Sequence, residues 1–303
     1  MTGHTLSLDS SFKTSLEGRG KDNRSIAWNG VRLHIPAPWD VRVSGQRHLV
    51  FEKDFQPQLQ IRWEKLVSYT PRYLQKRLAH FASQMGSIIP EKSFPTEFEP
   101  IRNNFALVTC FKNDHGIIQG GICLCHECHT LVLFQILSTT PVILKEVSLC
   151  LTALSCHNNS DTLWRVQDFS LTLPVSFSLK DYTFGAGLTR LSFSSSNLLL
   201  QTCTLGPADT RLSRQSLDEI LIILTGIPDL EISIDEDNNS CEGYRSPTIP
   251  KQIVIRLRRE KSFVRAKIWH DTVRNRLLAV VLSSNRPIPK TTTNKICSKY
   301  EIV

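Results

Sequence analysis

The chain contains two copies of one long pattern, and this duplication is the feature that most limits its fold. The segment Val31–Pro36 recurs as Phe169–Pro174, and the run 131–134 late in the first copy matches 277–280 late in the second. Repeats of this length indicate two tandem domains, because a solenoid is built from short repeats that stack three or more deep. The copies also act as an internal control: a residue type found in only one of them is not required by the fold.

Each copy begins with alternating apolar and polar residues, which is the pattern of a half-buried strand. In the first copy Val31, Leu33 and Ile35 share one face, and Pro36 ends the strand because proline cannot donate a ladder hydrogen bond. Each copy continues with two strands, a helix and three further strands. This order predicts an α+β protein of two homologous layered domains, each an antiparallel sheet covered by helices.

Capping residues mark the starts of the predicted helices. Thr70 precedes Pro71, Ser216 and Glu219 form a capping-box signature, and Thr140 precedes a closing helix in the first copy. No such signal follows the last strand of the second copy, so we predict no closing helix there.

The domain boundaries follow from the copies and from the polar stretches around them. We predict a disordered polar tail at 1–24, a first α+β repeat with a cysteine hairpin at 25–157, a second repeat at 163–290 and a loose C-terminal tail at 291–303. A chain of 303 residues suits two domains of ordinary size, about 100–150 residues each.

Apolar runs and cysteines bear on the compartment. The first 24 residues contain no apolar stretch typical of a secretory signal, and no apolar run reaches the roughly 18–20 residues that cross a bilayer. The sequence therefore predicts a cytoplasmic protein without membrane association. In that compartment we expect the nine cysteines to be reduced.

The opening strand of the first copy runs into Ile35-Pro36-Ala37-Pro38-Trp39, and the strand order and a late helix follow it. On these features the chain resembles tandem Mog1/PsbP-like αβα domains, with about 130 residues covered in each copy. The second copy departs from the pattern, because it has Phe177 in place of the Trp and no predicted closing helix. The resemblance implies domains that mostly bind protein partners, and it implies no catalytic residues.

The segment 123–129, Cys-Leu-Cys-His-Glu-Cys-His, has the most definite chemistry in the chain. Cys125 and Cys128 flank a two-residue turn, and two thiolates so spaced can bind Zn²⁺ at about 2.3 Å. Cys123 and His129 complete the predicted metal site. A closed site needs four ligands, and the further candidates are Cys110, His126, Cys150, Cys156 and His157.

Two other functions of the cysteine segment stay open. A C-x-x-C pair can perform thiol redox chemistry, and with His129 the string reads C-x-x-C-H, which attaches c-type haem. Haem attachment normally takes place in an export compartment, which the predicted absence of a signal disfavours. The corresponding turn of the second copy, 271–274, reads Asp-Thr-Val-Arg, so any metal site in the first copy is an addition to the fold.

The net charge of +8 is distributed unevenly, with an acidic block at 218–242 and a basic block at 251–299. Phe263 and Trp269 lie among the basic residues, and such a pattern on a sheet can bind single-stranded nucleic acid. No RNP-type string accompanies it, so we expect no nucleic-acid binding and a contact with the acidic block or with a neighbouring protein instead. The residues of this predicted partner-binding surface are Arg256, Arg258, Arg259, Lys261, Arg265 and Lys267.

Catalytic motifs are absent from the sequence: neither a phosphate-binding loop nor a G-x-S-x-G nucleophile motif occurs. This absence and the duplication favour a non-enzymatic protein-binding or assembly protein, whose partner and oligomeric state the sequence does not identify. The alternatives are a zinc-binding or thiol-redox protein and a nucleic-acid binder. No cofactor is predicted apart from the zinc ion.

Overall fold

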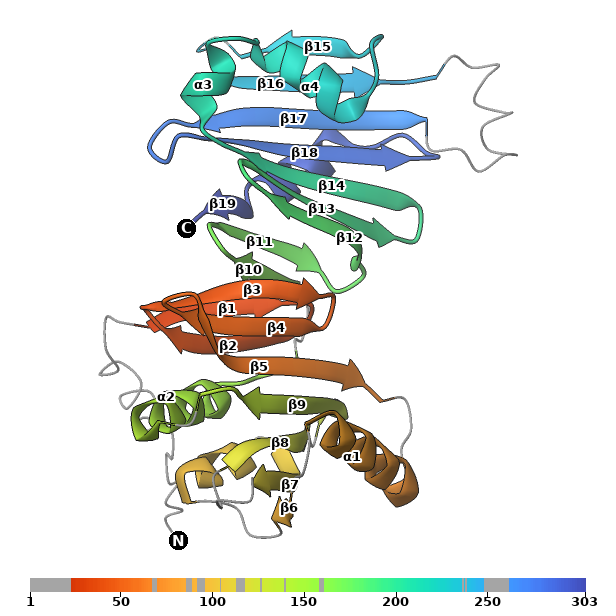
Figure 1. The fold of residues 1–303 in the computed structure, drawn as a ribbon. Coiled ribbons are helices and arrows are strands. Elements are labelled where there is room, and N and C mark those ends of the chain that lie inside the picture. The colour runs from red at the N-terminus through yellow and green to blue at the C-terminus, as the bar shows by residue number, and fades with distance from the viewer. Residues whose placement is uncertain are drawn as a thin grey trace, which may run out of the picture.

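Three antiparallel sheets form the protein, an elongated molecule in which a five-stranded sheet lies between two seven-stranded sheets (Figure 1). The computed structural model describes residues 23–66, 70–85, 89–91, 96–103, 105–112, 118–125, 127–138, 140–157, 161–235, 237, 239–247 and 262–303. Among these residues every strand pair is antiparallel.

The five-stranded sheet, here called the central sheet, combines the opening hairpins of both copies in the order β19-β11-β10-β1-β2. One backbone pair, Ala27 with Arg165, joins the hairpin of the first copy to that of the second. The strands are β1 (Asn23–Trp28), β2 (Val31–Pro36), β10 (Asp161–Val166), β11 (Phe169–Pro174) and β19 (Tyr300–Ile302).

The two seven-stranded sheets, here called the first and second sheets, have the orders β3-β4-β5-β9-β8-β7-β6 and β12-β13-β14-β18-β17-β16-β15. Matched in chain order, these two orders are the same, so the two copies share one topology. The first sheet contains β3 (Trp39–Gly45), β4 (His48–Lys53), β5 (Gln56–Lys65), β6 (Ile89–Glu91), β7 (Phe105–Lys112), β8 (Ile118–Cys125) and β9 (Thr130–Ile136). The second contains β12 (Ser178–Gly185), β13 (Leu188–Ser195), β14 (Leu198–Leu205), β15 (Glu231–Ile234), β16 (Ser240–Arg245), β17 (Phe263–Asp271) and β18 (Arg276–Ser284).

Helices are few and short compared with these sheets (Figure 1). The prediction of an α+β fold with sheets covered by helices is therefore wrong, and the fold is mainly antiparallel sheet. Within the described residues the helices are α1 (Pro71–Met85), the 3₁₀ helix η1 (Thr96–Asn103), α2 (Pro141–Thr152), α3 (Ala208–Leu212), α4 (Leu217–Thr225) and α6 (Lys290–Cys297).

The apolar faces of the sheets are covered largely by other sheets, because the main core connects all three sheets to one another. A single cluster of buried residues includes Phe51 of the first sheet, Trp28 of the central sheet and Leu278 of the second sheet. The Trp28 ring packs edge-on against Trp164 at 5.2 Å between centroids and against Tyr182 of β12 at 5.4 Å. Period-two alternation identifies a half-buried strand but does not show whether a helix or a second sheet covers its apolar face.

The predicted helix starts are confirmed. The Thr140 hydroxyl accepts a hydrogen bond from the backbone N–H of Ile143 at 3.4 Å, and the Thr70 hydroxyl accepts from that of Tyr73 at 3.2 Å. Ser216 and Glu219 form the capping box. These contacts join residues three positions apart, so the local sequence is sufficient to predict them.

The C-terminal segment departs from its prediction, since residues 291–303 are ordered rather than loose. They contain most of α6, and β19 pairs with β11 through Ile302 to Phe169 and Tyr300 to Leu171. The helix has a weak sequence signal, because the side chains that it buries are those of Thr293 and Ile296 and no continuous apolar stripe is present.

Two further predictions concern the chain ends and the membrane. Residues 1–22 lie outside the described residues, and Asn23 and Arg24, which were assigned to the polar tail, begin β1. Among the helices of the described residues, none combines the length and the apolar character that a membrane-spanning helix requires.

Candidate metal centre

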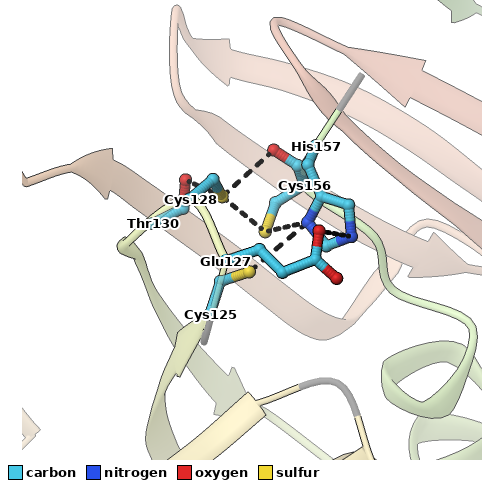
Figure 2. Close-up of polar contacts among 6 residues, drawn as sticks. All are labelled: Cys125, Glu127, Cys128, Thr130, Cys156 and His157. Carbon is cyan, nitrogen blue, oxygen red and sulfur yellow. Dashed lines mark hydrogen bonds and ion pairs between the residues drawn. The ribbon is translucent and has the colours of Figure 1, made fainter. Parts of the chain in front are cut away.

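Three thiols and one imidazole converge beside the junction between the two copies (Figure 2). Cys125 is the last residue of β8 and Cys128 lies in the turn before β9, whereas Cys156 and His157 follow α2. Their four ligand atoms all lie within 4.8 Å of one another. This group could hold a metal ion, and we call it the Cys/His group.

Backbone hydrogen bonds hold both contributing segments in place. The Leu66 N–H donates to the carbonyl of His129 at 3.1 Å, which attaches the turn to the end of β5. On the other segment, Ser155 and Arg32 exchange two backbone hydrogen bonds of 2.8 Å, which position the next residue, Cys156, beside the central sheet. The Cys/His group therefore connects the first sheet to the central sheet.

The separations within the group suit a tetrahedral ion. The Cys128 and Cys156 Sγ atoms are 3.3 Å apart, and the Nδ1 of His157 is 3.4 Å from the Cys125 Sγ and 3.9 Å from the Cys156 Sγ. Bonds of about 2.3 Å to a tetrahedral zinc place sulfur ligands roughly 3.7 Å apart. A disulfide needs about 2.05 Å, so Cys128 and Cys156 are free thiols.

Electrostatics in the group favour an anionic sulfur at Cys128. Partial burial raises the pKa of Cys128, but hydrogen bonds with Thr130 and Cys156 outweigh it and lower the pKa to about 7. Burial, together with hydrogen bonds to Cys128 and Cys125, raises the pKa of Cys156. The lower pKa of Cys128 favours Cys156 as the donor in the hydrogen bond between the two sulfur atoms, and a cation between them would replace the shared proton.

A second set of contacts orients the ligands from outside the group (Figure 2). With its Nδ1 toward the sulfur atoms, His157 has Nε2 at 3.4 Å from a carboxylate oxygen of Glu127. The Thr130 hydroxyl lies 3.1 Å from the Cys128 Sγ. A carboxylate on the outer nitrogen of a histidine is the usual partner of a metal-bound imidazole, because it fixes the tautomer and the ring orientation.

The predicted ligands are divided by the structure. Cys125 and Cys128 belong to the Cys/His group, whereas Cys123 is buried in the main core and His129 is an exposed turn residue, with its backbone at a φ of 55°. Among the further candidates, Cys156 and His157 join the group, and Cys150 lies buried on α2. His126 and the side chain of Cys110 lie outside the described residues. The sequence signal that could have identified Cys156 and His157 as ligands is that a cysteine and a histidine stand next to each other after a capped helix.

The second copy provides the internal comparison. Its corresponding turn is closed by Asp271, which accepts a hydrogen bond from the Arg274 N–H at 3.0 Å and forms an ion pair with its guanidinium at 3.6 Å. The strand pairs Ser155 with Arg32 and Glu301 with Ser170 occupy equivalent places, so Cys156 and His157 correspond to Ile302 and Val303. The second copy therefore has no metal ligand pair at either segment.

The predicted basic surface has intramolecular partners where it is described. The Arg265 guanidinium lies over the Tyr244 ring at 4.5 Å, and its Nε donates to the Ile288 carbonyl at 3.1 Å. Lys267 forms a 3.2 Å ion pair with Glu242 of the acidic block. The remaining members of the surface, Arg256, Arg258, Arg259 and Lys261, lie outside the described residues.

None of the family models, curated proteins or solved structures compared with the chain matches it. The resemblance to Mog1/PsbP-like domains therefore stays a prediction, and the case for a function comes from the Cys/His group.

Proposed function

We propose that the chain binds one zinc ion through Cys125, Cys128, Cys156 and His157. The observation that carries this proposal is the convergence of four ligand atoms within 4.8 Å, from segments far apart in the sequence. Three sulfurs and one imidazole nitrogen form a donor set that suits zinc, whereas magnesium and calcium prefer oxygen ligands. Four protein ligands leave no coordination position for a substrate, which is the arrangement of a structural site.

The role of the ion follows from the difference between the copies. In the second copy β19 pairs with β11 along three residue pairs, but in the described part of the segment after α2 the one strand pair with β2 is the Arg32–Ser155 bridge. After this bridge the chain leaves β2 and continues into β10 of the second copy. In the second copy the β19–β11 strand pairs attach this segment to the central sheet. In the first copy the zinc ion provides the attachment instead.

Metal content tests the proposal directly. We expect about one equivalent of zinc in the protein purified without chelator, and much less in Cys125→Ser and Cys156→Ser variants, since each removes one of four ligands. Cys297→Ser is the matched control, because Cys297 is a partly buried free thiol on α6 outside the group. Metal-free protein with the same melting temperature in chelator and in added zinc would contradict the proposal.

A thiol-redox function is the second candidate, and the 3.3 Å separation of the Cys128 and Cys156 sulfur atoms favours it. Oxidation by one hydrogen peroxide would form the S–S bond and break the peroxide O–O bond, and the two thiol hydrogens would leave in the two water molecules that the peroxide becomes. Peptide mapping distinguishes the candidates: zinc-loaded protein should retain both thiols, and a disulfide in metal-free protein as isolated would favour the redox function. The protein-binding or assembly function that the duplication favours remains an untested prediction.

A further inference from the structure

A cavity of about 390 Å³ opens beside the Cys/His group, at the junction of the two copies. Cys128, Cys156 and His157 form part of its lining, Trp63 comes from the first sheet, and Phe177 comes from the start of the second copy. A volume of this size is in the range of small-molecule sites, which characteristically combine apolar walls with a few polar groups.

Two cationic side chains, Arg47 and Lys65, also line the cavity. Among the described residues neither side chain has an ion pair or a hydrogen bond, and no Asp or Glu belongs to the cavity lining. Positive charge without a compensating acid in a partly enclosed space attracts anions, because the low-dielectric walls focus the field.

The second copy has the equivalent cavity, of about 350 Å³, and there the charge is balanced. Gly187 ends the turn between β12 and β13, as Arg47 ends the turn between β3 and β4. Gly206 directly follows β14, whereas Lys65 is the last residue of β5, so neither glycine brings a charge to the cavity of the second copy. The cation of this cavity is Arg276, which forms an ion pair with Asp168 at 3.2 Å. The same corner of the fold thus has an ion-paired arginine in the second copy, whereas in the first copy it has two cationic side chains without an ion pair among the described residues.

The aromatic residues add a second requirement on the ligand. Trp63 and Trp164 line the cavity together with the partly buried Phe177, so an apolar group is accommodated beside the charges. The Trp164 indole N–H is buried without a hydrogen-bond partner among the described residues, whereas the Trp63 N–H donates to the Asn29 carbonyl at 3.2 Å.

We propose that this cavity binds a small organic anion, a carboxylate or a phosphate ester that carries an aromatic or other apolar group. The negative charge of the ligand pairs with Arg47 and Lys65, and its apolar part packs on Trp63 and Phe177. The proposal goes beyond the zinc site and does not rest on it, because the charged and aromatic residues that carry it are not metal ligands.

Calorimetric titration of the full-length protein with phenyl phosphate, benzoate and neutral benzyl alcohol tests the proposal. We expect the two anions to bind, the alcohol to bind at least tenfold more weakly, and the anion affinity to fall as salt rises. Tighter binding of phenyl phosphate identifies a phosphate ester as the ligand class, and tighter binding of benzoate identifies a carboxylate. Arg47→Gln and Lys65→Gln should each weaken anion binding at least tenfold, whereas Lys145→Gln, on the exposed face of α2 outside the cavity, should not.

The competing explanation is that the two cations only balance three thiolates on a zinc ion. Anions that fail to bind the wild type, or that bind the Arg47→Gln, Lys65→Gln double variant equally well, would overturn the proposal. Zinc content measured on the same samples separates the two proposals. If zinc is present but no anion binds, only the cavity proposal is contradicted. If an anion binds but no zinc is present, only the metal-site proposal is contradicted.

Discussion

The Sγ of Cys128 lies 3.3 Å from the Sγ of Cys156, although 28 positions separate the two residues in the chain. The contact closes a loop that contains β9 and α2 and brings the end of the first copy back to its cysteine hairpin. A link across a loop of this length restricts the unfolded chain, so a metal ion bound there would add stability beyond that of the local contacts.

The zinc proposal predicts a large stability difference between the loaded and the metal-free protein. Cys125→Ser with Cys128→Ser should release the metal and lower the free energy of unfolding by several kcal/mol, because the binding energy of a structural site is folding energy. Urea denaturation with and without chelator measures this difference. A change below about 1 kcal/mol, as for exposed turn substitutions, would show that the hairpin cysteines are unligated.

The lowered pKa of Cys128 predicts a pH dependence in the metal-free protein. The folded pKa of about 7 lies below the ordinary thiol value of 9.0, so the thiolate contributes stability that is present above pH 9 and is lost as pH falls through 7. The raised pKa of Cys156 acts in the opposite direction, but only above pH 9. Chemical denaturation in chelator from pH 6.5 to 9 should show stability rising with pH, and Cys128→Ser should remove the rise.

The shared core predicts that the two copies unfold together. Trp28 is fully buried and contacts Trp164 and Tyr182 of the second copy, so Trp28→Ala should cost about 3–5 kcal/mol. In the wild type and in the Trp28→Ala variant alike, unfolding followed by fluorescence and by circular dichroism should give one coincident transition. Two separate transitions, with only the first shifted by the substitution, would show that the copies are independent units.

The ordered C-terminus predicts that its last residues contribute to stability. The buried Tyr300 hydroxyl forms a 2.6 Å hydrogen bond with Thr204. Tyr300→Phe should therefore cost about 0.5–1.5 kcal/mol, through the lost hydrogen bond. Tyr300→Ala should cost about 3–5 kcal/mol, because it also leaves a cavity. Thermal melts of the two variants measure both effects. Melting temperatures equal to that of the wild type would indicate a loosely held tail, as the sequence predicted.

The acidic and basic blocks predict an electrostatic contact within the second copy. Burial opposes ionisation of Glu242, but hydrogen bonds and charge from Lys290 and Lys267 outweigh it and lower its pKa. This contribution to stability is present above the ordinary carboxyl pKa and is lost as pH falls through the lowered value. Glu242→Gln should cost about 1 kcal/mol at pH 7 and much less in acid.

The same contact bears on nucleic-acid binding. With Lys267 paired to Glu242 and Arg265 over Tyr244, we expect no measurable affinity for a single-stranded oligonucleotide at physiological salt. Fluorescence anisotropy checks this expectation, and a micromolar complex that weakens steeply with salt would contradict it.

Features that depend on neighbouring residues were predictable from the sequence. The caps at Thr140 and Ser216, the strand that ends at Pro36 and the Cys125–Cys128 pair all follow from spacings of a few residues. The duplication likewise predicted that the cysteine hairpin is specific to the first copy, and the Asp271–Arg274 closure of the second copy agrees with it.

Contacts between distant segments needed the tertiary structure. Alternation along β1 and β10 identifies apolar faces, but only the packed molecule shows that the sheets cover one another and that Trp28 meets Trp164. Tertiary contacts likewise decide that Cys156 and His157, and not Cys123 and His129, join Cys125 and Cys128 in the Cys/His group. Strand pairing at Ser155 brings the first pair to the hairpin, and no local pattern contains that information because the pairing joins residues more than a hundred positions apart.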